Sequence, residues 1–208
     1  MTGIVAQNVA RASGLIKTAS GGSGGVWTLI KTLTASSSST LSFVDGASDV
    51  TFDSTYPIYR CVFINVHPSN DEAYLTFQGS DDTTNYGIAL TSTYFYASHD
   101  EGDTATSLSY DTGSDLAQST DFHKISQGIG NGNDESCSGE MWLFSPSSTT
   151  FAKHFISRSS TYEDSNKMYD VHTGGYINTT AAIEAIQFKM TAGNIDTGTF
   201  KLYGLGDS

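Results

Sequence analysis

From residue 26 onward, short apolar runs alternate with clusters of turn-forming residues, and this alternation constrains the fold more than any other feature of the sequence. The apolar run at 59–66, whose two faces both look buried, ends in the turn cluster at 67–71. A second run follows at 73–78, so the two runs are expected to form a hairpin. Further strands are predicted at 27–33, 40–44, 94–96, 140–144, 150–158, 182–190 and 199–205. About eight to ten short strands with turns between them predict an all-β fold, an antiparallel β-sandwich of jelly-roll-like form.

The composition agrees with this fold class and excludes several others. Aromatic residues make up 12% of the chain and charged residues only 15%, which is unlike a disordered acidic chain. No apolar run approaches the ~18 residues that a membrane span requires, so we expect no membrane partner. A net charge of −12 also argues against a nucleic-acid partner, because such a partner requires a basic face.

The charges are unevenly divided along the chain. The first 44 residues contain three bases, Arg11, Lys17 and Lys31, and no Asp or Glu. Within this segment, residues 20–25 are all Gly or Ser and predict a flexible linker. We therefore divide the chain into an N-terminal arm with its linker, residues 1–25, and a β-sandwich domain, residues 26–208.

The arm shows helical periodicity over residues 3–18, which predicts a short amphipathic helix or arm. An isolated helix of this length is marginal in water and needs a partner surface to remain folded. Two interpretations stay open, a disordered tail and a docking segment that orders against a partner. In the second, the buried residues are Ile4, Val5, Val9, Leu15 and Ile16.

The two cysteines, Cys61 and Cys137, match no zinc-binding pattern. Two free thiols, as in a protein made in a reducing cytoplasm, are favoured over a disulfide between them. The N-terminus lacks the pattern of a signal peptide, so we expect any route out of the cell to be other than the general secretory one.

Motifs that would indicate catalysis or metal binding are weak. The G-x-S-x-G match at 21–25 lies in the linker rather than between a strand and a helix. The glycine-rich stretch at 128–132 lies beside acidic residues that would repel phosphate. The acidic stretch at 99–103 does not have the spacing of the twelve-residue calcium loop, and a solvated loop tip is favoured there over an ion site. We expect no catalytic residue, no metal site and no cofactor.

Tyrosines in or near the predicted loops are the strongest candidates for ligand contacts. They could stack on sugar rings or anchor a protein interface, where tyrosine is enriched. Core packing is the alternative for about half of them. The candidate ligand-facing residues are Tyr86, Tyr94, Tyr96 and Tyr110.

The C-terminal half, from about residue 100, resembles virion proteins of marine tailed bacteriophages, including cyanophages. The likeness lies in Trp142-Leu143-Phe144-Ser145-Pro146-Ser147-Ser148-Thr149-Thr150, Lys153-His154-Phe155-Ile156-Ser157-Arg158, Gly175-Tyr176-Ile177-Asn178-Thr179-Thr180, Ala185-Ile186-Gln187-Phe188-Lys189-Met190, Gly193-Asn194-Ile195 and Gly198-Thr199-Phe200-Lys201-Leu202-Tyr203-Gly204. The pattern carries no catalytic motif. It implies a non-enzymatic structural component of a phage particle.

The resemblance leads to two functional hypotheses. The first is a capsid decoration, head-fibre or tail-fibre subunit that is assembled in the host cytoplasm and attached to other capsid or tail proteins through its arm. By analogy with projecting phage modules, a homotrimer is expected. The second is a receptor- or carbohydrate-binding module of the tail, with a host surface glycan as ligand. A polysaccharide-degrading enzyme is a third and weaker hypothesis.

Overall fold

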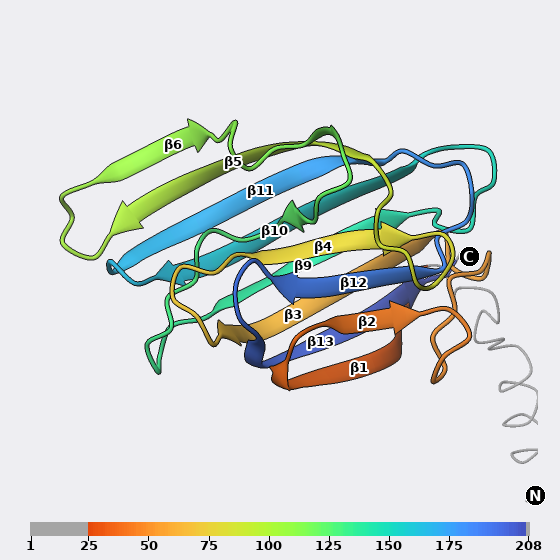
Figure 1. Ribbon diagram of the computed structural model, residues 1–208, viewed down its shortest axis with the longest axis horizontal. Helices are drawn as coiled ribbons and strands as arrows, with labels where there is room; N and C mark the ends of the chain where they lie inside the picture. Colours follow the sequence, from red (N-terminus) through yellow and green to blue (C-terminus); the bar gives the residue numbers. More distant parts are fainter. Residues whose placement is uncertain (1–24, 207–208) are drawn as a thin grey trace, which may run out of the picture.

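The computed structural model describes residues 25–206, and the elements of this part of the chain are thirteen β-strands, without a helix. Nine strands form a large antiparallel sheet, in the order β1 (Trp27–Ser38), β13 (Ile195–Leu205), β3 (Ile58–Pro68), β9 (Cys137–Phe144), β10 (Lys153–Glu163), β11 (Lys167–Ile177), β5 (Leu90–Asp100) and β6 (Thr106–Tyr110), with β7 (Ala117–Ser119) also paired to β5. Four strands form a small sheet, in the order β2 (Leu41–Val44), β12 (Ala185–Met190), β4 (Leu75–Ser80) and β8 (His123–Lys124). The small sheet lies over part of one face of the large sheet (Figure 1), which confirms the predicted antiparallel β-sandwich.

The core lies between the two sheets and is built from aromatic pairs. Phe188 of the small sheet packs against Phe200 of the large sheet with ring centroids 5.1 Å apart, and Phe77 packs against Phe155 at 4.8 Å. All four side chains are fully buried. Contacts of this kind add to the stabilisation from the buried apolar area and fix how the sheets face each other.

The predicted hairpin of 59–66 with 73–78 is wrong. Strand β3 pairs with β13 and β9 in the large sheet, whereas β4 pairs with β12 and β8 in the small sheet. The turn cluster at 67–71 therefore carries the chain from one sheet to the other. Both strands alternate in sequence as hairpin strands do, and the sequence pattern does not distinguish a partner in the same sheet from one in the opposite sheet.

The burial of β3 and β4 also differs from the prediction. Only one face of β3 is buried, and its other face carries the half-exposed Arg60 and Val62. Every residue of β4 is buried, because loops cover the outer face of the small sheet. Gln78 shows this cover, since its Nε2 donates hydrogen bonds to the carbonyl oxygens of Ile88, Thr120 and Asp121 at 3.1–3.2 Å.

Two long strands of the large sheet differ from the prediction. The short strand expected at 94–96 is the centre of the eleven-residue β5. Strand β11, also of eleven residues, was not predicted, since its glycines and polar residues hide its alternation.

Cys61 and Cys137 are both free and buried, which confirms the prediction of two thiols. Burial raises the pKa of both thiols, because the thiolate would lose its hydration. The two groups are therefore inert core residues.

The sandwich has two distinct ends. Strand β1 begins directly after the predicted linker, and Trp27 pairs with Leu205, so the first and last described residues share one end. The turns between β5 and β6 and between β10 and β11 lie at the opposite end (Figure 1), which we call the far end.

The predicted docking residues Ile4, Val5, Val9, Leu15 and Ile16 lie outside the described residues. A search of the described residues for a helix long and apolar enough to cross a membrane finds none.

Candidate functional site

The outward face of the large sheet, which we call the open face, is exposed over its central strands in the described structure. Strand β10 shows this most clearly, since Phe155 and Ser157 are buried, whereas Ile156 is 49% exposed and Arg158 is exposed. Exposed apolar side chains on a sheet face are characteristic of binding surfaces. We therefore take the open face as the candidate functional site.

An arginine held between two tryptophans forms one side of this site. Trp27 and Trp142 meet edge to face with ring centroids 5.3 Å apart. The guanidinium of Arg60 lies over both rings, at 5.8 and 5.5 Å from their centroids, and its Nε donates a hydrogen bond to Glu140. Cation–π contacts and an ion pair together fix the orientation of all four side chains.

A second ion pair lies on the neighbouring strands. Arg158 donates from Nε and Nη2 to the two carboxylate oxygens of Asp170, at 2.9 and 2.8 Å. This bidentate pair holds the pKa of Asp170 below its ordinary value. His172 lies 3.4 Å from the same carboxylate, and its ring stacks in parallel on Phe95 at 5.1 Å.

Between these two groups of side chains the open face contains a depression with a volume of about 460 Å³. The register places Trp142, Ile156, Gly174 and Thr93 side by side on β9, β10, β11 and β5. Because Gly174 has no side chain, the sheet surface is low at its centre, with Trp142 toward one side and His172 and Phe95 toward the other. We call this depression the aromatic hollow. Its lining residues are Thr93, Phe95, Glu140, Trp142, Ile156, Ser157, Arg158, His172, Thr173 and Gly174.

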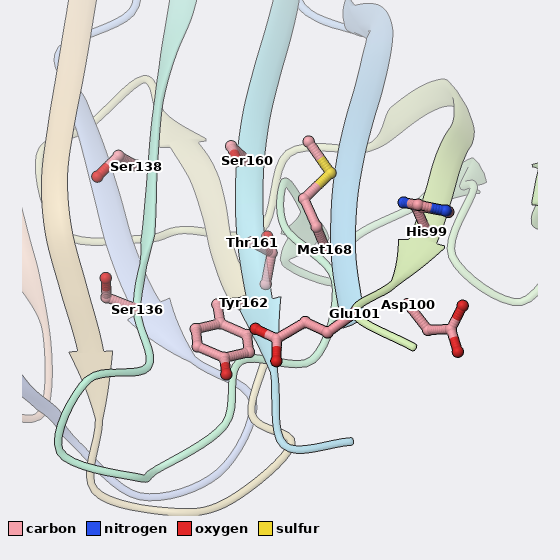
Figure 2. A pocket seen from close by; sticks show the side chains of 9 residues that line it. All are labelled: His99, Asp100, Glu101, Ser136, Ser138, Ser160, Thr161, Tyr162 and Met168. Atoms are coloured by element: carbon pink, nitrogen blue, oxygen red, sulfur yellow. The ribbon is translucent and has the colours of Figure 1, made fainter. Parts of the chain in front are cut away.

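The aromatic hollow continues toward the far end as two further depressions. Glu140 and Arg158 are shared with the middle one, of about 420 Å³. Ser138, Ser160 and Met168 are in turn shared between the middle one and the outermost, of about 380 Å³. Figure 2 shows the outermost depression, where serine hydroxyls lie on the adjacent strands and Tyr162 approaches Glu101. The open face therefore carries a row of three adjoining depressions, aromatic at one end and hydroxyl-rich at the other.

The tyrosines predicted from the sequence do not form this site. Tyr94 is fully buried on β5 and its hydroxyl donates to the carbonyl oxygen of Ser126, so the prediction of a ligand-facing loop residue is wrong for it. Tyr96 is half-buried against Tyr169. Both rings lie at alternate positions of β5, which extends well beyond the short strand predicted at 94–96 and turns this face toward the core.

The remaining two tyrosines are more accessible but also lie away from the hollow. Tyr86 is half-buried near Phe122, with ring centroids 6.5 Å apart. Tyr110 is 50% exposed at the edge strand β6, and its hydroxyl donates to Asp115 at 2.6 Å. Neither lines the aromatic hollow.

The polar side chains of the acidic stretch at 99–103 form hydrogen bonds with one another and with the residues that follow directly. His99 pairs with Asp103 at 3.1 Å, and the Asp100 carboxylate accepts hydrogen bonds from Thr104 and from the Ala105 backbone. These hydrogen bonds, first that of the Thr104 side chain, lower the pKa of Asp100 to about 2. Among the described residues, the acidic groups close enough to share an ion are Glu72, Glu163 and Asp164 at the far end. This cluster was not predicted, since its members come from two separate turns.

The residues of the open face escaped the sequence prediction for an identifiable reason. Glu140 and Trp142, like Ile156 and Arg158, alternate with core residues on recognised strands. An alternating strand does not indicate whether its outer side chains meet solvent or a second layer. The sequence did contain one indication of this face. On each of these strands a large apolar side chain and a charged side chain occupy successive outward-facing positions.

Comparison of the chain with protein-family models, with curated proteins and with solved structures gives no significant match. The functional proposals therefore rest on the residues of this chain and on the expectation drawn from its sequence.

Proposed function

We propose that the protein is a non-enzymatic structural protein of a bacteriophage particle, a capsid decoration, head-fibre or tail-fibre subunit attached through residues 1–25. The observation that carries the proposal is the position of β1. Trp27 pairs with Leu205, so the linker joins the body at one end of the sandwich. A body joined in this way projects its far end away from the surface that receives the arm. The likeness of the C-terminal half to virion proteins supports the same role.

The distribution of charge supports attachment through the arm. Residues 1–25 carry Arg11 and Lys17 and no acid. The body, by contrast, carries acidic turns at both ends, at 100–103, 134–135 and 163–164 at the far end and at 45–53 and 81–82 at the end where β1 begins. A weakly basic apolar arm therefore suits an acidic receiving surface better than the acidic body does. The proposal includes a homotrimer, by analogy with other projecting phage modules.

Removal of the arm tests this proposal. We expect the full-length chain to co-sediment with phage particles that lack the protein, and residues 26–208, which contain all thirteen strands, to lose at least tenfold in affinity. The substitution Val9→Asp in the full chain should weaken binding in the same direction, because it charges the apolar stripe. The matched control is Leu108→Asp, a change at an 80% exposed side chain on the body, which should bind as the wild type does. Equal binding by the full and truncated chains would contradict attachment through the arm.

A second candidate function, a receptor- or carbohydrate-binding module, is favoured by the open face. Trp142 and Phe95 flank a hollow whose rim carries the charged residues Glu140 and Arg158. A particle-bound protein can present such a face to a host surface, so the two functions are compatible.

A further inference from the structure

We infer that the aromatic hollow of the open face is a binding site for a neutral oligosaccharide. This inference goes beyond attachment to a particle, and it assigns the ligand to the sheet face instead of to the tyrosine-bearing loops. It follows from three properties of the hollow, namely its ring surfaces, its paired charges and its fixed shape.

The ring surfaces provide stacking positions on both sides of the hollow. Trp142 stands on β9 and His172, stacked on Phe95, stands two strands away on β11. Neighbouring strands are ~4.8 Å apart, and Trp142 is in register with Gly174, two residues from His172, so these side chains are rooted roughly 12 Å apart. This span suits one or two sugar rings, whose C–H faces pack against aromatic rings. Phe95 is 41% exposed, so part of its surface is available for such a contact.

The charges around the hollow favour a neutral polyhydroxyl ligand over an ion. Arg60 pairs with Glu140 and Arg158 pairs with Asp170, so two positive and two negative groups balance each other. A polyanion would also meet a chain whose net charge is −12. Guanidinium groups have spare N–H donors and carboxylates have spare lone pairs, which are the partners that sugar hydroxyls need. Such hydrogen bonds form without separating the ion pairs.

The hollow is held in shape by the protein itself. Arg60 is fixed by two rings and a carboxylate, and Arg158 is fixed by a bidentate pair. Binding to such a site costs little side-chain entropy. The depth of the hollow depends on Gly174, where an added Cβ would lie 3.6 Å from Ile156 Cγ2, an ordinary contact. A Cβ at 174 therefore meets only ordinary contacts, and a larger side chain there would extend from the open face into the hollow.

The two tryptophans provide a direct readout. The chain contains two Trp residues, and both Trp27 and Trp142 belong to the open face. We would first screen the full-length protein on an array of neutral oligosaccharides built from glucose, galactose, mannose, xylose and N-acetylglucosamine, with sulfated and uronic-acid oligosaccharides as a separate arm. Neutral sugars that bind would then be titrated in solution, with tryptophan fluorescence recorded. We expect a saturable fluorescence change with a neutral oligosaccharide.

Two substitutions at one position separate filling the hollow from damaging the fold. Gly174→Val should lower the affinity for that oligosaccharide at least tenfold and leave the thermal midpoint near that of the wild type. Gly174→Ala, which adds only one methyl group, should reduce affinity by a smaller factor. Trp142→Ala should also abolish the fluorescence change and the binding.

The other outcomes overturn the inference. No binding to neutral sugars, preferential binding to the acidic arm, or full binding by Gly174→Val would each contradict it. Concentration-dependent self-association that Trp142→Ala abolishes would show instead that the face receives a second copy of the chain. Attachment through the arm is measured by co-sedimentation with particles, so its failure is distinguishable from failure of sugar binding.

Discussion

The substitution Gly139→Ala is expected to lower the free energy of unfolding by about 3 kcal/mol or more, as overpacking of a rigid core does at its upper range. A Cβ at this position would lie 2.3 Å from the carbonyl oxygen of Arg158, 2.7 Å from Ser159 Cα and 2.8 Å from Phe63 Cζ. Two of these atoms are backbone atoms of the neighbouring strand, and the third belongs to a fully buried ring. The methyl group can enter only if β9 and β10 separate or the core ring moves.

Chemical denaturation in urea measures this loss, and Gly174→Ala is its matched control. Both glycines lie in long strands of the same sheet, and both variants add one methyl group. At 174 the nearest atom would be 3.6 Å away, so the change in stability should stay within about 0.5 kcal/mol. Equal stabilities for the two variants would show that the approach of β9 to β10 is looser than described.

The substitution His123→Phe is expected to make the protein more resistant to acid than the wild type. His123 is fully buried between Phe77 and Phe155, its Nδ1 lies 3.3 Å from Ser92 Oγ, and its Nε2 has no hydrogen-bond partner among the described residues. Burial lowers the pKa of His123 from 6.5 to about 3, because the charged ring would be desolvated.

This depressed pKa fixes the sign of the pH dependence. Between about pH 6.5 and pH 3 the unfolded chain binds a proton at His123 that the folded chain does not bind. Wild-type stability therefore falls as the pH falls through this window, by roughly 1 kcal/mol per pH unit from this group. His123→Phe removes that contribution. The free energy of unfolding of the variant, relative to that of the wild type, should therefore rise steadily as the pH is lowered from 7 to 4.

Urea denaturation at several pH values measures the difference between the two slopes. His154→Phe is the matched control, because it makes the same substitution at an exposed position of the large sheet. Parallel pH profiles for the wild type and His123→Phe would contradict a neutral buried histidine in the core.

The sequence predicted the fold class because that depends on local alternation, which β10 and β13 display clearly. It did not predict the pairing of β3 and β4, because partner choice depends on contacts distant in sequence. Strand β11 was missed for a local reason, since Gly174 and Gly175 dilute its apolar pattern. The same residue that hid the strand, Gly174, creates the aromatic hollow.

The candidate site was harder to predict than the fold. Tyr94 and Tyr96 were predicted to face a ligand because they lie near predicted loops, yet both belong to the side of β5 that packs against the core. Trp27, Arg60 and Trp142 lie far apart in sequence, and only the sheet order brings them together. Sites assembled across neighbouring strands in this way have no fixed spacing that a motif search could use.

Electron cryomicroscopy of particles decorated with the full-length protein tests whether the body projects from a phage particle on its N-terminal arm. We expect density for the sandwich at regular lattice positions, with the Trp27–Leu205 end toward the particle and the turns at 100–105 and 163–166 pointing outward. The open face should then remain accessible from the side. Density with the far end or the open face against the particle, or no ordered density, would rule out attachment through the arm.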